Sequence, residues 1–141
     1  VKSGQVMASL GQMEVLDERV TRRREIFARY KVSLSRPGIS FMPEPGSQFS
    51  TRWLTALTID PALVGADRET IRLALLEHQI ESRPVWKPMH LQPLYWGAPY
   101  HGSGFDERCF EHGLCLPSGS DMSDAQQDEV IEHVLTVLDT A

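Results

Sequence analysis

The chain has 141 residues, of which 41% are hydrophobic and 23% are charged, and its formal net charge at pH 7 is −5. This length and composition are ordinary for a soluble globular protein, so we expect residues 1–141 to form a single domain. The acidic balance argues against nucleic acid as a partner and the short apolar runs exclude a membrane-spanning helix, so we expect a cytoplasmic protein that contacts neither nucleic acid nor membrane.

The first thirty or so residues are predicted to form one long helix. Its apolar residues recur at spacings of three or four until Arg36-Pro37-Gly38 ends the pattern, and they are Met7, Leu10, Met13, Leu16, Val20 and Phe27. Pairs such as Glu18–Arg22 support the helix, and we interpret Arg22, Arg23 and Arg24 as a solvated, ion-paired face.

This first helix has no evident N-capping residue, and two interpretations of residues 1–31 stay open. The helix is either the outer helix of the domain or a link to a missing domain. The second interpretation predicts an exposed apolar patch in the isolated chain.

Two strands and a second helix are predicted next. Residues Ile39–Met42 are a short strand candidate, and Arg52–Ile59 combines β-branched and aromatic residues with a partial alternation. Asp60-Pro61 closes this strand. Asp67 can cap a helix that runs to about Gln79, whose inner face would include Ile71, Ala74 and Leu75.

The segment that follows is predicted to be a strand and then a long loop. Pro84 would confine a strand over Ile80–Val85 to a sheet edge or a strand end. Residues Trp86–Gly104 are rich in Pro, Gly and aromatic residues and show no helical period. Loops of this length in a compact domain are commonly functional.

The C-terminal part is predicted to contain a short helix, a strand and a last helix. The helix spans Asp106–His112, the strand spans Leu114–Leu116, and Ser123 with Gln126 makes a capping box for the last helix. This order of elements predicts an α+β fold, in which helices cover a small sheet of mainly antiparallel strands.

Residues 81–93 carry the densest set of chemical groups. Three prolines restrict the backbone, and an Arg, a Lys, a His, a Gln and a Trp lie among them. Such a loop suits an anionic or polyhydroxylated ligand. Arg can bind a carboxylate or phosphate through two hydrogen bonds, and Trp can pack against the apolar face of a sugar. A loop docked on its own domain, with Trp86 in the core, explains the composition equally well.

Cys109-x-x-His112-x-x-Cys115, with His101 nearby, offers four residues of the types that bind zinc. The spacing is not a standard zinc pattern, and one cysteine falls in a predicted strand. Because cysteine is commonly buried, we interpret the two cysteines as core residues and expect no metal site.

Three segments occur in an order that resembles one enzyme family. They are GQMEVLDERVTRRREIFARY at 11–30, ESRPVWKPMHLQP at 81–93 and GLCLPSGS at 113–120, and they are similar to the nucleotide-sugar aminotransferases of the DegT family. The similarity runs from about Gln5 to the C-terminus. It implies the C-terminal small domain of a homodimeric fold-type I enzyme that uses pyridoxal phosphate.

The resemblance also implies a reaction for the parent enzyme. Members move an amino group from glutamate to a nucleotide-linked 4-keto sugar for glycan biosynthesis, and the WKPMHLQP form is most similar to the branch that acts on UDP-linked sugars. The family's Schiff-base lysine lies in a Ser-x-x-x-x-Lys segment ahead of a Gly-rich stretch.

A match to that lysine segment occurs from Ser82 to Lys87, but prolines flank it, and we interpret it as chance. Neither Lys2 nor Lys31 is a convincing anchor. We therefore expect that this chain alone binds no pyridoxal phosphate and has no catalytic residue.

The resemblance assigns substrate-binding roles within the loop. His90, in Pro-x-His-x-Gln-Pro, matches the family's histidine that reaches the active site, which implies contact with the substrate. Trp86 and Lys87 replace the family's more usual Tyr-Pro dipeptide and would flank the sugar or the diphosphate.

Arg83 resembles a small-domain residue that meets a carboxylate such as that of glutamate, although an ion pair with Glu81 or Glu107 is the favoured explanation. Gln92 and Pro93 are expected to hold the loop. Two other functions stay open: a non-catalytic module that binds a nucleotide sugar, and a structural or dimerisation domain.

Overall fold

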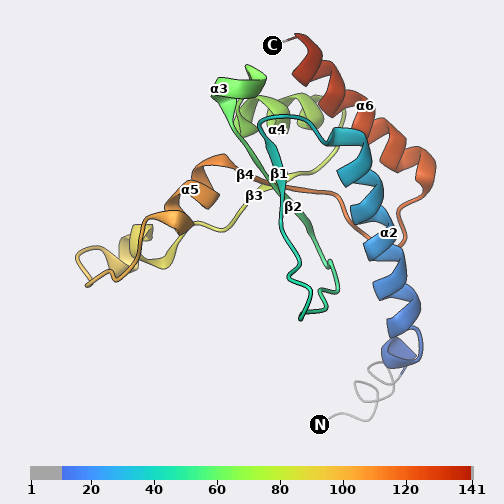
Figure 1. The fold of residues 1–141 in the computed structure, drawn as a ribbon, viewed down its shortest axis with the longest axis horizontal. Helices are drawn as coiled ribbons and strands as arrows, with labels where there is room; N and C mark the ends of the chain where they lie inside the picture. Colours follow the sequence, from blue (N-terminus) through green and yellow to red (C-terminus); the bar gives the residue numbers. More distant parts are fainter. Residues whose placement is uncertain (1–10, 141) are drawn as a thin grey trace.

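A computed structural model describes residues 11–140, which form a four-stranded antiparallel sheet with helices packed against it (Figure 1). The elements are α2 (Leu16–Leu34), β1 (Ile39–Phe41), β2 (Thr55–Ile59), α3 (Pro61–Val64), α4 (Arg68–Glu77), β3 (Arg83–Pro84), the 3-10 turns η1 (Met89–Leu91) and η2 (Pro93–Tyr95), α5 (Phe105–His112), β4 (Gly113–Leu116) and α6 (Asp124–Thr140). The predicted α+β class is confirmed. Within this part of the chain, no helix has the length and apolarity needed to cross a bilayer.

The strands lie in the order β1-β2-β4-β3, and every neighbouring pair is antiparallel. Strand β4 is central, and all four of its residues are buried. Strand β3 is an edge strand, as Pro84 predicts. The backbone N–H of Val85 continues the pairing by donating to the carbonyl of Gly113 at 3.1 Å, so the N–H that Pro84 lacks would have faced away from β4.

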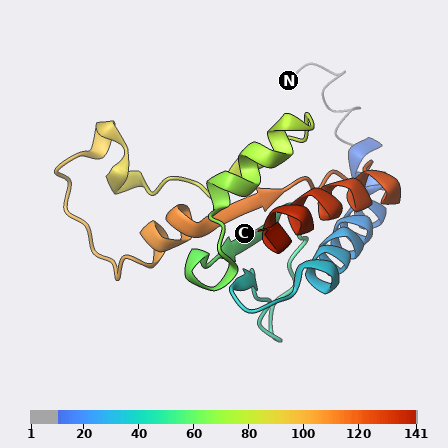
Figure 2. The ribbon, with the colours of Figure 1, turned by 90° about the horizontal axis from the view of Figure 1, so that it is seen from above.

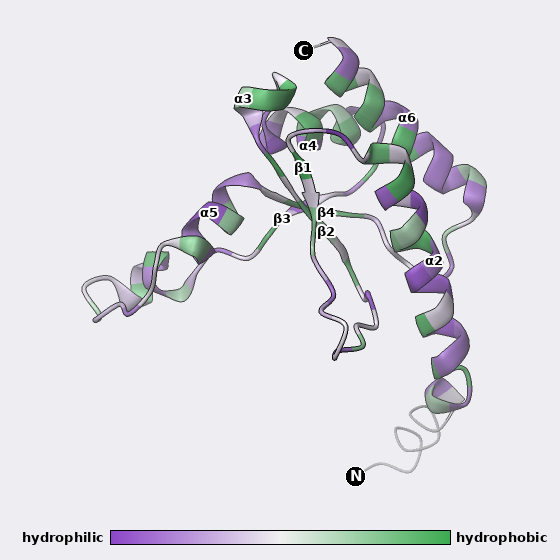
Figure 3. Ribbon diagram, viewed as in Figure 1, coloured by the Kyte–Doolittle hydropathy of each residue, from purple (hydrophilic) through white to green (hydrophobic). Residues whose placement is uncertain are grey.

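Helices α2, α4 and α6 enclose the core on one face of the sheet. Alternate residues of β2 and β4 face this core. Core residues of the two strands lie opposite each other, as Leu57 and Leu114 do. Figure 3 shows that α2 and α6 carry both hydrophilic and hydrophobic stretches, as helices with one buried side do. Seen from above, α2 and α6 lie at one end of the molecule, and residues 86–104 extend away at the other (Figure 2).

Helix α2 confirms the predicted first helix over Leu16–Leu34, three residues beyond the expected end. Its N-cap, Val15, makes no side-chain capping hydrogen bond. Met7 and Leu10, the first two residues of the predicted apolar pattern, lie outside the described residues. Met13 is 68% exposed and Leu16 is half exposed. The outer-helix interpretation and the linking interpretation of residues 1–31 both stay predictions.

The arginine cluster on α2 is only partly the solvated face that the sequence predicts. Arg22 pairs with Asp124 at 2.7 Å and Arg24 pairs with Glu44 at 2.8 Å, while Arg23 donates to the carbonyl oxygen of Trp53. All three arginines are half-buried. They therefore tie α2 to other segments, whereas spacing along the helix could suggest only partners on the same helix.

The prediction of a strand from Arg52 is wrong for its first three residues, because β2 begins at Thr55. Arg52 has a φ of 49°, which a strand does not allow. Its side chain is buried, with the guanidinium 3.9 Å from the centre of the Phe27 ring and donating to the carbonyl oxygen of Met42. The buried cation closes the loop between β1 and β2 and sets where β2 can start.

Asp60-Pro61 follows the end of β2 at Ile59, as the sequence predicts, and begins α3, where Asp60 accepts a hydrogen bond from the N–H of Ala62 at 3.0 Å. Two other expectations need correction. The strand predicted over Ile80–Val85 is reduced to the two residues of β3. The long loop predicted as irregular contains η1 and η2, single turns that are too short to produce a helical period.

The predicted helix caps are confirmed. Asp67 accepts a hydrogen bond from the backbone N–H of Thr70 at 2.8 Å at the start of α4. Ser123 and Gln126 form the reciprocal capping box ahead of α6, with distances of 3.2 Å and 2.9 Å. Of the predicted inner face of α4, Ile71 and Leu75 are buried.

Candidate functional site

Residues 86–104 form a long excursion, the arm, which leaves the sheet after β3 and returns at α5 (Figure 1). Most of its residues are exposed, including Trp96 at 89% and Leu94 at 84%. The arm holds three of the four residues that the sequence nominates for substrate binding, His90, Trp86 and Lys87. It is therefore the candidate site.

Four side chains, the His90 cluster, fix the arm to the beginning of α5: His90, Tyr100, Asp106 and Glu107. The Nε2 atom of His90 lies 2.7 Å from Oε1 of Glu107, and its Nδ1 atom lies 3.7 Å from Oδ2 of Asp106. The imidazole stacks on the Tyr100 ring with their centres 3.9 Å apart, and the Tyr100 hydroxyl donates to Asp106 at 2.5 Å.

In the His90 cluster, the interactions of Asp106 and Tyr100 keep the Asp106 carboxyl ionised and the Tyr100 phenol protonated at neutral pH. The hydrogen bond from Tyr100 lowers the pKa of Asp106, and backbone N–H groups at the start of α5 and the nearby His90 lower it further. The same hydrogen bond raises the pKa of Tyr100, with a smaller contribution from burial. Tyr100 therefore stays a hydrogen-bond donor and Asp106 stays its acceptor.

His90 faces inward in this arrangement. Its side chain is only 16% exposed, and both ring nitrogens point to carboxylates of α5. The ring therefore holds the middle of the arm in place. The substrate contact that the resemblance implies for His90 stays a prediction. It requires the ligand to reach the imidazole, or the residues next to it, while the ring keeps this orientation.

Trp86 does not lie in the core, so that interpretation of the sequence is wrong. It is 63% exposed and stacks on Trp53, with ring centres 5.9 Å apart and an interplanar angle of 24°. Lys87 is exposed, and its carbonyl oxygen accepts a hydrogen bond from Gln92 at 3.3 Å, which agrees with a loop-holding role for Gln92. Sequence reasoning missed Trp53, since nothing local to residue 53 indicates a partner at residue 86.

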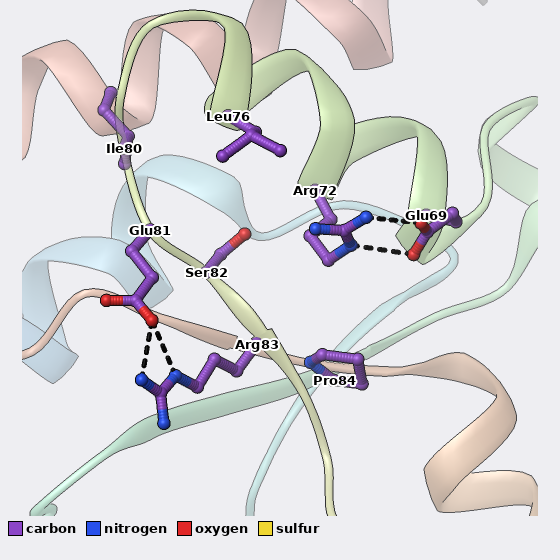
Figure 4. Close-up of a pocket in the computed structure, with 8 residues that line it drawn as sticks. All are labelled: Glu69, Arg72, Leu76, Ile80, Glu81, Ser82, Arg83 and Pro84. Atoms are coloured by element: carbon purple, nitrogen blue, oxygen red, sulfur yellow. Dashed lines mark hydrogen bonds and ion pairs between the residues drawn. The ribbon is translucent and has the colours of Figure 1, made fainter.

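Arg83 lies outside the arm and is neutralised by Glu81. Its Nε and Nη2 atoms lie 2.8 Å and 2.6 Å from Oε1 of Glu81, which confirms the ion-pair explanation. Both side chains line a cavity of about 540 Å³ between α4 and residues 80–84 (Figure 4). The other guanidinium there, that of Arg72, is held by Glu69, so the cavity offers no uncompensated cation to a carboxylate.

A second cavity, of about 730 Å³, lies between α2 and the loop that joins β1 to β2. Glu44 accepts hydrogen bonds from both Arg24 and Arg52 at this cavity. Hydrogen bonds from Arg24 and from the backbone N–H of Ser50 lower the pKa of Glu44 from 4.5 to about 2. This network fastens the loop to α2.

The cysteines are not placed as metal ligands. Cys115 is buried in β4, and burial raises the pKa of its thiol. Over residues 11–140, no group of three or more His, Cys, Asp or Glu side chains is arranged to hold a metal ion.

Comparison with known proteins relates the chain to a family of aminotransferases. The model of the DegT/DnrJ/EryC1/StrS aminotransferase family matches residues 5–135. EpsN of Bacillus subtilis, to which a pyridoxal phosphate-dependent aminotransferase activity is assigned, is 45% identical over 96% of this chain and 36% of its own length. The GDP-perosamine synthase of Escherichia coli O157:H7 is 30% identical over 89% of this chain and 33% of its own length.

Solved structures agree. The aminotransferase TlmJ of Streptoalloteichus hindustanus superposes with a TM-score of 0.77 at 30% identity, over 92% of this chain and 34% of that one. The aminotransferase PseC of Helicobacter pylori has the same fold, with a TM-score of 0.80 at 15% identity over 94% of this chain and 36% of that one. The chain thus spans about a third of the length of the relatives that it matches.

The described residues do not fit covalent attachment of pyridoxal phosphate. A lysine that forms a Schiff base is activated in a pocket that lowers its pKa. Lys31 and Lys87, the lysines within residues 11–140, are both exposed, and Lys2 lies outside the described part. The interpretation of the Ser82–Lys87 match as chance stays a prediction.

Proposed function

Because the chain belongs to the DegT/DnrJ/EryC1/StrS aminotransferase family, we propose that it is the small-domain part of a pyridoxal phosphate-dependent sugar aminotransferase. The parent would transfer an amino group from glutamate to a nucleotide-linked 4-keto sugar, with UDP as the nucleotide, for glycan biosynthesis. It would act as a cytoplasmic homodimer. The lysine and the cofactor would belong to the part of the protein that this chain does not contain.

One observation carries the proposal for this chain: the arm projects from the domain and is tied to it at two places. The His90 cluster fixes its middle to α5, and the Trp53–Trp86 stack fixes its beginning. Holding a substrate in a defined geometry can supply a large part of a catalytic effect without any reacting group. The arm would orient the sugar, and the chemistry would take place elsewhere in the parent.

The proposed roles within the arm follow from position and exposure. Trp86 and Lys87 are exposed and would flank the sugar or the diphosphate. His90 would set the position of the arm and meet the sugar only at the exposed edge of its ring. Arg83 would have to break its ion pair with Glu81 before it could bind the carboxylate of glutamate.

A chimera tests this function. The third of EpsN that matches this chain is replaced by this chain, and transfer of the amino group from glutamate is measured with UDP-, dTDP- and GDP-linked 4-keto sugars. We expect activity that is highest with the UDP-linked sugar and that falls in kcat/KM in the His90→Ala variant. His101→Ala, an exposed histidine of the same arm outside the His90 cluster, is the matched control. A folded chimera without transfer to any of these sugars contradicts the proposal.

A second experiment tests the division of labour. The chain alone is mixed with pyridoxal phosphate, and we expect no new absorbance band of a lysine–cofactor adduct. A borohydride-reducible adduct at Lys87 would show instead that the chain carries its own cofactor anchor.

A further inference from the structure

The Trp53–Trp86 stack joins two segments that the sequence separates by 33 positions. Trp53 lies two residues before β2 and Trp86 lies two residues after β3, and these strands flank β4 on its two sides. The stack therefore depends on the folded sheet. It stands between the loop that precedes β2 and the root of the arm.

Both indoles stay open to solvent although they stack on each other. Trp53 is 60% exposed and Trp86 is 63% exposed. Large aromatic side chains normally bury most of their surface, and an exposed, pre-stacked pair is a platform on which a further planar ring can stack. The two rings hold each other in place, so little side-chain freedom remains to be lost when such a ring binds.

Two cations accompany this platform. The Nη1 atom of Arg23 donates to the carbonyl oxygen of Trp53 at 2.5 Å, which brings the guanidinium to the backbone of the platform. Lys87 follows Trp86 directly. Among the ion pairs of residues 11–140, neither Arg23 nor Lys87 has a carboxylate partner within 4.0 Å, in contrast to Arg72 and Arg83 in the cavity described above.

An aromatic platform with the guanidinium of Arg23 at its backbone suits a planar ring that carries phosphate groups. Stacking holds the ring, and a guanidinium with free N–H donors binds phosphate oxygens. A neutral sugar would leave the cations unused, and inorganic phosphate would leave the indoles unused. A nucleoside diphosphate uses both.

We propose that Trp53 and Arg23, together with Trp86, bind the nucleoside diphosphate part of the substrate. This inference rests on the proposed function, which supplies a nucleotide-linked substrate, and it adds two residues from outside the arm. Trp53 would stack on the base through the shared platform, and Arg23 would meet the diphosphate.

Tryptophan fluorescence of this chain tests the inference. The chain has three tryptophans, and the Trp96→Phe variant leaves only the stacked pair as reporters. In this background we expect saturable quenching by UDP, weaker quenching by uridine, and a much smaller response to inorganic pyrophosphate. Trp96→Phe also serves as the matched control, since it alters an exposed arm residue outside the stack.

Two substitutions separate the two interactions. Trp53→Ala should weaken UDP binding about tenfold, as expected for the loss of one stacking partner, and calorimetry replaces fluorescence for this variant. Arg23→Gln should weaken UDP binding and leave uridine binding unchanged. Far-UV circular dichroism and the thermal midpoint verify that each variant is folded.

Three outcomes overturn the inference: no saturable response to UDP at millimolar concentration, pyrophosphate bound as strongly as UDP, or UDP binding that a folded Trp53→Ala variant retains. All the proposed contacts lie within residues 11–140, so binding by this chain alone is required. The chimera can still be an active aminotransferase in any of these cases, and that result separates failure of the inference from failure of the proposed function.

Discussion

The hydroxyl of Ser118 accepts a hydrogen bond from the backbone N–H of Thr55 at 2.9 Å and donates one to the carbonyl oxygen of Leu116 at 2.8 Å. Ser118 follows the end of β4, and Thr55 begins β2, so the hydroxyl extends the pairing of the two central strands beyond their last backbone partners. Both residues are buried.

The Ser118→Ala variant should lower the free energy of unfolding by about 1–3 kcal/mol, because the buried N–H of Thr55 loses the hydroxyl oxygen that accepts its hydrogen bond. Chemical denaturation measures this change. Ser120→Ala removes a hydroxyl two residues away that accepts only from the exposed Arg19, and it should change the stability little. Equal effects of the two substitutions would contradict the prediction.

Glu44 should make the stability of the fold depend on pH. Its pKa is lowered to about 2 in the folded chain from 4.5, so its contribution is fully present above pH 4.5 and is lost as the pH falls toward 2. The difference in free energy of unfolding between the wild type and Glu44→Gln should therefore be largest near neutral pH and should shrink over that interval. Denaturant titrations at a series of pH values measure it.

The matched control for Glu44 is Glu18→Gln, which alters an exposed carboxylate on α2 that takes part in no ion pair among the described residues. Glu18→Gln removes a carboxylate from the same helix without breaking the contacts of Glu44, so it tests whether any effect is specific to the Glu44 network. A flat difference for Glu44→Gln would show that Arg24 does not hold this carboxylate.

Asp67 should stabilise α4 through its cap. Asp67→Ala removes the acceptor for the backbone N–H of Thr70, and we expect a loss of about 1 kcal/mol in the free energy of unfolding. Asp67→Asn keeps a capping oxygen without the charge and should retain most of the stability. If the Asn and Ala variants are equally destabilised, the charge and not the hydrogen bond is responsible.

The His90 cluster should control local opening of the arm and not global unfolding. His90→Ala removes the contacts with Glu107, Asp106 and Tyr100, while the core under the sheet is untouched. We expect faster hydrogen exchange over residues 88–104 with unchanged exchange in α6. His101→Ala is the control, and an unchanged exchange pattern in His90→Ala would mean that other contacts hold the arm.

Features that depend on neighbouring residues could be predicted from the sequence. The caps at Asp67 and Ser123 and the edge position required by Pro84 follow from short-range chemistry, and all three are confirmed. The α+β class follows from the order of these elements.

Features that depend on distant residues could not be predicted. The Trp53–Trp86 stack joins segments brought together only by β4, and the partner of His90 lies 17 residues away on another helix. The start of β2 was misplaced because burial of the Arg52 guanidinium over Phe27, and not local strand preference, fixes the backbone there. In the candidate site the residue types could therefore be read from the sequence, but not the direction in which each side chain points.

Pro84 has a further consequence, for how the sheet meets other polypeptides. Because β3 is only two residues long and lacks an amide donor on its outward side, a foreign strand has almost nothing to pair with there. Aggregation by addition of strands is blocked at this end. Any continuation of the sheet into a second chain has to begin at the opposite border, along Ile39–Phe41.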